Sequence, residues 1–182
     1  MEIRQVTPPS VLPVSLSEAR WQCSLLDGRQ DDLLLTLIRS ASAYVETHIR
    51  ARLCEQTVMF ISPKFPSVLP IYPVQSITSV EYIDSDGATQ ALDSADYYIT
   101  TASMYPKMTA ITDWPAVDDR PDAVKITAVM GFTATPEDIK AAILMRVKES
   151  FDRRSESVAG ISTAPAFVRI ADLLVPHRML PL

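Results

Sequence analysis

The chain has little of the residue types that build common catalytic and metal sites. Its 182 residues include only four glycines, two cysteines and two histidines. Four glycines leave little material for a loop around a phosphate, and there is no Walker loop and no G-x-G-x-x-G motif. His48 and His177 belong to no H-x-x-x-H or cysteine–histidine cluster, so no zinc site is predicted. A G-x-S-x-G elbow is also missing. The sequence therefore signals no enzyme, no metal and no cofactor.

Cysteine pairs and long apolar runs are missing as well. Cys23 and Cys54 occur singly without C-x-x-C spacing, so we interpret them as small apolar residues in a reducing compartment. No run of about 18 apolar residues exists, and residues 1–13 lack the basic and apolar regions of a signal peptide. We expect a protein that does not enter a membrane and is made in the cytoplasm.

Positive charge is scarce in the middle of the chain. The formal net charge is −5, and nine acids between Glu81 and Asp122 face only Lys107 and Arg120. Affinity for nucleic acid comes mainly from lysine and arginine contacts to phosphate, so this stretch is not expected to hold DNA. An acidic surface would let DNA slide past, although most such surfaces are simply solvated. Trp21 and Trp114 are interpreted as packing residues rather than platforms for bases.

Proline placement divides the chain into helical and extended parts. No proline falls between Val14 and Ser62 or between Glu137 and Ala164, whereas eight of the fourteen lie between Pro63 and Pro136. Because proline is excluded from helix interiors and central strands, this pattern predicts helices, then turns and strands, then a helix. We therefore expect helical parts at 14–54 and 132–156, an inserted β-rich lobe at 55–131, and a linker with a tail at 157–182.

Three helices are predicted from capping signals and apolar spacing. Ser15 to Glu18 has the spacing of a capping box and starts a helix that ends near Leu26. A second helix starts near Asp31 and carries a stripe through Leu34, Leu37, Ile38, Ala41, Tyr44, Val45 and Ile49. A late helix follows Thr135 as N-cap and Pro136, with a stripe of Ile139, Ala142, Ile143, Val147, Ser150 and Phe151. We expect the three to form a small bundle.

Between the helices, several short segments read as strands. Ala123 to Met130 shows the alternation of a half-buried strand and feeds through Gly131 toward the late helix. The other candidates are Gln56–Ile61, Ser76–Asp84, Thr89–Leu92, Tyr97–Thr100 and Met108–Ile111. Asp84 to Gly87 opens like a calcium loop, but the later ligand positions are absent, so we interpret it as a hairpin turn. The expected fold class is α+β, with an antiparallel lobe inserted into the bundle.

The last part of the chain is apolar although a small-residue linker precedes it. Phe167, Ile170, Leu173 and Leu174 form a short amphipathic segment that ends at Pro176, His177 and Arg178. Disordered tails are poor in such residues. Two explanations stay open at this point: the tail completes the core of its own domain, or it docks on another subunit or another protein.

The order of these parts resembles that of tailed-phage head–tail connector (adaptor) proteins. The likeness covers roughly residues 14–178, and it lies in the order of individually weak motifs. They are Ser15-Leu16-Ser17-Glu18-Ala19, Asp31-Asp32-Leu33, Ala43-Tyr44-Val45-Glu46, Pro70-Ile71-Tyr72-Pro73-Val74, Tyr82-x-Asp84-x-Asp86-Gly87, Trp114-Pro115, Pro136-x-x-Ile139-x-x-Ala142-Ile143 and Leu173-Leu174-x-Pro176-His177-Arg178.

The resemblance implies a non-enzymatic neck protein of a phage or phage-like virion, present in the host cytoplasm during assembly. Such adaptors form a ring, about twelve-fold, under the portal protein and receive the stopper or tail-completion protein on the other side. DNA passes through the channel without sequence-specific binding. Because the contacts in such a ring are heterologous, two different faces of each subunit must match. The residues expected to bind the portal are Phe167, Ile170, Leu173, Leu174, Pro176, His177 and Arg178.

Two other classes of protein remain as alternatives. One is a small-ligand or peptide-binding module with its pocket in the β-rich lobe, which a ligand would stabilise. The other is a hydrolase that uses aspartate and histidine, whose activity would depend on His48 or His177.

Overall fold

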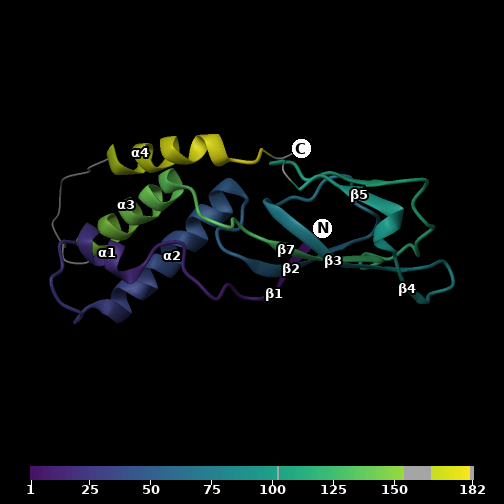
Figure 1. Cartoon of the computed structure of the whole chain (residues 1–182), viewed down its shortest axis with the longest axis horizontal. Coiled ribbons are helices and arrows are strands. Elements are labelled where there is room, and N and C mark those ends of the chain that lie inside the picture. Colours follow the sequence, from purple (N-terminus) through teal and green to yellow (C-terminus); the bar gives the residue numbers. More distant parts are fainter. Residues whose placement is uncertain (102, 154–164, 181–182) are drawn as a thin grey trace. The chain divides into compact units, whose positions relative to one another are not determined.

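The computed structural model describes residues 1–101, 103–153 and 165–180, which form two units (Figure 1). The β unit comprises 1–10, 54–133 and 179–182, and the helical unit comprises 11–53 and 134–178. The fold is α+β, with helices in the first third and the last third of the sequence and an antiparallel sheet, which confirms the predicted class.

The β unit is built on a five-stranded antiparallel sheet in the order β1-β2-β7-β3-β4. Its strands are β1 (Glu2–Thr7), β2 (Gln56–Ser62), β3 (Val74–Ile83), β4 (Thr89–Ala91) and β7 (Val124–Met130). A separate two-stranded ribbon pairs β5 (Tyr97–Ile99) with β6 (Met108–Ala110), after the short 3-10 helix η1 (Ser94–Asp96). Each strand predicted from sequence is present, within two residues at its ends.

The alternation of β7 decides where the core of the β unit lies. Val124, Ile126, Ala128 and Met130 are buried, whereas the residues between them are half-buried. β7 lies between β2 and β3, so it has a bonded neighbour on each edge. Its buried side chains join a cluster formed by Val58, Phe60, Leu69, Ile71, Val74, Val80 and Met108.

Gly131 ends β7 in a conformation that other residues rarely adopt. Its φ is +120°, and a Cβ there would lie 2.2 Å from the carbonyl oxygen of Cys54. The N–H of Gly131 donates to the carbonyl of Pro73 at 3.0 Å, and its carbonyl accepts from the side chain of Gln75 at 2.9 Å. The glycine is therefore required by close backbone packing as well as by the turn.

The helical unit holds α1 (Leu16–Gln22), α2 (Asp31–Ile49), α3 (Glu137–Arg153), α4 (Pro165–Leu174) and the 3-10 helix η2 (Val175–His177). The predicted capping box is present, because Ser15 accepts from the N–H of Glu18 and Glu18 reaches back to the N–H of Ser15. Thr135 was predicted to be the N-cap of the late helix. It lies two residues before α3, and its hydroxyl instead donates to the carbonyl of Leu53 at 3.0 Å.

Most residues of the predicted stripes lie in the core of the helical unit, but Leu37 and Tyr44 on α2 are only half-buried. Ser150, placed on the α3 stripe, is exposed. The buried side chains come from both long helices: Leu34, Ile38, Ala41, Val45 and Ile49 on α2, and Ile139, Ala142, Ile143, Val147 and Phe151 on α3. No helix in the described part of the chain is long and apolar enough to cross a membrane.

Two features near the N-terminus differ from the sequence analysis. β1 was not predicted, and all six of its residues are exposed, because the strand lies at the edge of the sheet. Trp21 is not a packing residue: its exposed fraction is 86%, and Leu26 on the following loop is fully exposed. Trp114 does pack, since its ring stacks on that of Phe65 with the centroids 4.4 Å apart.

Candidate partner-binding site

The C-terminal segment, here residues 165–178 with α4 and η2, folds onto its own helical unit. α4 contacts α3 and, less extensively, α2 (Figure 1). Ile170 has an exposed fraction of 2%, and Leu174 is fully buried. Their spacing of four residues places them on one side of α4. This side of α4 therefore completes the core of its own unit, which is the first of the two explanations given for the apolar tail.

The residues predicted to bind a partner divide between two environments. Ile170 and Leu174 are covered by the chain itself, and Leu173 and His177 are half-buried. Pro176 and Arg178 are exposed, and so is Val175, which was not predicted and has an exposed fraction of 64%. The side chain of Phe167 lies outside the described residues. A partner can therefore reach Val175, Pro176 and Arg178 while α4 stays in place.

His177 fastens the end of the segment to α3. Its Nε2 lies 2.6 Å from Oδ2 of Asp138, in the first turn of α3. Burial raises the pKa of Asp138, but the hydrogen bond and charge of His177, with the N–H of Ile139, outweigh it, so the pKa lies below its ordinary value. The carboxylate also complements the helix N-terminus. The contact therefore fixes the exposed residues around it.

The two long helices that support this segment are also tied by an aromatic contact. The guanidinium of Arg146 on α3 lies 3.9 Å from the ring centre of Tyr44 on α2. The same ring stacks on His48 with the centroids 5.9 Å apart. Because a cation over an aromatic face is attracted to it, Arg146 adds to the apolar packing between the two helices.

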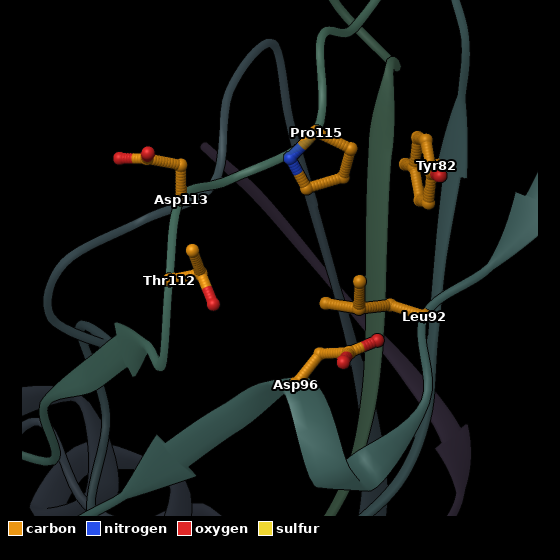
Figure 2. A pocket seen from close by; sticks show the side chains of 6 residues that line it. All are labelled: Tyr82, Leu92, Asp96, Thr112, Asp113 and Pro115. Atoms are coloured by element: carbon orange, nitrogen blue, oxygen red, sulfur yellow. The ribbon is translucent and has the colours of Figure 1, made fainter.

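A second candidate is a hollow of about 290 Å³ in the β unit. Tyr82, Leu92 and Pro115 supply apolar walls, and Asp96, Thr112 and Asp113 supply polar groups. Figure 2 shows the carboxylate of Asp113 pointing away from the other five side chains, so Asp96 is the acid that faces the hollow. At the lower end of ligand-pocket sizes, the hollow suits one long side chain better than a drug-sized molecule.

Sequence reasoning placed a possible pocket in the β-rich lobe but identified none of the residues of the hollow, and it interpreted Trp21 as a packing residue and did not foresee the exposure of Leu26. The hollow joins β3, the loop around η1 and the loop after β6, which are brought together only by the fold. No spacing in the sequence could have revealed it. For Trp21, the neighbouring polar residues Arg20 and Gln22 were the available signal that the end of α1 faces solvent.

No protein-family model and no curated protein sequence matches the chain. Several solved structures do match it. A chain from the neck of an empty gene transfer agent (GTA) particle, computed with C6 symmetry, shares 20% identity with a TM-score of 0.79, over 100% of this chain and 97% of that one. A chain from the virion of the native GTA particle shares 19% identity with a TM-score of 0.79, over 100% of this chain and 97% of that one.

A third structure, the neck of the native GTA particle computed with C12 symmetry, contains a chain that is 19% identical with a TM-score of 0.77, over 100% and 97% of the two chains. The similarity extends over both units rather than one of them, since the whole of this chain is covered in each case. The chain therefore has the fold of these GTA neck chains from end to end.

Proposed function

We propose that this protein is a structural neck component of a tailed phage or phage-like particle, and more specifically a head–tail connector. In this role copies of the chain form a ring under the portal, and the ring receives the stopper or tail-completion protein. The role requires no catalysis and no cofactor. DNA crosses the ring without sequence-specific binding.

The observation that carries the proposal is the full-length similarity to neck chains of GTA particles at TM-scores of 0.77 to 0.79. Two of those necks were computed with C6 and C12 symmetry, which supports a ring of copies for this chain too. The number of copies and the neighbours in the particle belong to the proposal, and twelve is the number we expect.

The exposed part of the C-terminal segment is the proposed portal contact. Val175 and Pro176 are exposed on the short 3-10 helix η2, Arg178 is exposed directly after it, and the last residue of η2, His177, is held by Asp138. Such a fixed turn binds without first losing conformational freedom. Ile170 and Leu174 anchor the preceding helix α4 in the core of the helical unit. Phe167, Leu173 and His177 remain members of the proposed site.

The test is the mass of the protein measured by light scattering with and without the cognate portal. The wild type should join a portal complex, and Val175→Asp with Arg178→Glu should weaken that complex at least about tenfold, as loss of interface anchors does. Both side chains are exposed, so the melting temperature should not change. A protein that stays monomeric and ignores portal would contradict the connector role.

Deleting the whole tail at Gly160 is a poorer test, because it would uncover the surface of α3 now covered by Ile170 and Leu174. Ile170→Asp is the matched control: it should unfold the segment and lower the melting temperature, whereas the surface variants should not. If the surface variants bind portal like the wild type, the assignment of the contact fails but the connector role does not. Ligand screening against the hollow would then test the alternative of a binding module.

A further inference from the structure

Formal charge is distributed very unevenly between the two units. The β unit has eleven acids and five bases, a net charge of −6, whereas the helical unit has eleven acids and twelve bases, a net charge of +1. A ring built from heterologous contacts needs two different faces that attract each other.

On the helical unit, the outer face of α2 is our candidate for one of the two surfaces that form the ring contact. Its exposed residues recur at three- and four-residue spacing along more than four turns: Asp32, Thr36, Arg39, Ser40, Ala43 and Thr47, and the exposed C-cap residue Arg50 follows directly after the helix. The hydroxyls of Thr36 and Thr47 are bonded to the carbonyls of Asp32 and Ala43, so these side chains present mainly methyl groups. The face therefore consists mostly of short side chains, from which the longer side chains of Arg39 and Arg50 project.

Neither arginine has an acidic partner within the described chain. The other described arginines of the helical unit outside the C-terminal segment do have partners: Arg20 pairs with Asp31, Arg29 with Asp27, Arg52 with Glu46 and Arg153 with Glu149, and Arg146 lies over Tyr44. Arg39 and Arg50 are eleven residues apart, about 16 Å along the helix. Their exposure leaves both guanidinium groups available to another molecule.

The hollow of the β unit offers a complementary surface. Asp96 has no ion pair in the described chain, and Asp93 and Asp113 beside it are exposed too. Tyr82, Leu92 and Pro115 provide apolar surface for the aliphatic stem of a long side chain, and Asp96 and Thr112 provide acceptors at its end (Figure 2). An arginine has this combination of stem and planar donor group.

We propose that the outer face of α2 in one copy docks on the acidic hollow of the β unit in the next copy, with Arg39 or Arg50 entering beside Asp96. This contact is heterologous, so repeating it closes a ring or extends a chain. The inference rests on the proposed ring and deepens it by naming the two surfaces. Charge attraction also predicts that assembly weakens as salt rises.

The test uses full-length protein assembled alone at high concentration and on the portal, with self-association followed by sedimentation and cross-linking. Asp96→Lys, Arg39→Glu and Arg50→Glu are each compared with the wild type. Asp96→Lys and one of the arginine variants should weaken association at least about tenfold, as reversal of an interface charge does. The controls Glu2→Lys and Arg29→Glu make the same changes in charge at exposed positions elsewhere and should leave association unchanged.

A charge swap identifies the arginine. Asp96→Lys combined with the correct arginine→Glu variant should regain association, because each copy then offers the reversed pair to its neighbour. Full rings from both Asp96→Lys and the double variant Arg39→Glu/Arg50→Glu would overturn the inference and leave the connector role intact. A wild type that never associates, alone or on portal, would overturn both.

Discussion

His177 and Asp138 meet across 39 positions of sequence, with Nε2 of the histidine 2.6 Å from Oδ2 of the aspartate. The side chains are 21% and 40% exposed, so the contact lies at the edge of the helical core. It is the point at which the end of the C-terminal segment is tied to the start of α3. Its strength should decide how often that end opens.

Replacing His177 with alanine should loosen η2 without unfolding the helical unit. Half-exposed ion pairs contribute about 1 kcal/mol or less, so a small fall in the free energy of unfolding is expected. Amide hydrogen exchange should rise in residues 174–178 and stay constant in α2. His177→Gln keeps a donor near Asp138 and should behave more like the wild type. Unchanged exchange in the alanine variant would show that the contact does not hold the segment.

The same contact predicts a dependence on acid. The pKa of Asp138 is lowered in the folded protein, so its contribution is complete above the unfolded value of about 3.9 and is lost as pH falls through the lower folded value. Between about pH 5 and pH 2, the wild type should therefore lose more stability than Asp138→Asn. Urea midpoints across this range measure the difference. Parallel curves for the two proteins would contradict the prediction.

Gly131 and Gly87 allow backbone strain to be separated from steric overlap. Both have positive φ, +120° and +81°, but a Cβ at Gly87 would meet nothing within 4 Å. Gly87→Ala should cost about 1 kcal/mol, from conformation alone. Gly131→Ala should cost about 3 kcal/mol or more, because its Cβ would overlap the backbone at Cys54. Chemical unfolding measures the loss of stability in each variant. Equal losses in the two variants would refute the prediction that Gly131→Ala costs more.

Truncation of the two tryptophans should have very different effects on the free energy of unfolding. Trp21→Ala should change stability by no more than about 0.5 kcal/mol, because the side chain is 86% exposed. Trp114→Ala removes the stacked contact with Phe65 and should cost about 2 kcal/mol. Fluorescence gives an independent measure: Trp21 should emit at long wavelength and be quenched readily by iodide. A blue-shifted, protected Trp21 in the free protein would contradict the structure.

Elements with two-sided environments were the easiest to predict from the sequence. β7 has a buried and a half-buried face, and α2 and α3 each have one buried stripe, so their side-chain periodicity carries the signal. β1 has no such contrast. Its six exposed residues are held through backbone bonds to β2, to which no side-chain pattern corresponds.

The candidate sites were harder to predict because they depend on what covers each residue. The sequence places Ile170 and Leu174 on one side of a helix, but only the contacts of α4 show that this side is used within the chain. The hollow around Asp96 depends on three segments that the sequence separates by up to 33 positions, from Tyr82 to Pro115.

The bond from the Thr135 hydroxyl to the Leu53 carbonyl has a consequence for dissecting the molecule. It places at hydrogen-bonding distance the two points where the chain leaves the helical unit and returns to it. A gene for residues 11–178 in which a short joint replaces residues 54–133 should therefore encode the helical unit alone, with no long gap to bridge. No simple truncation can do this, because each unit is assembled from separate stretches of the chain.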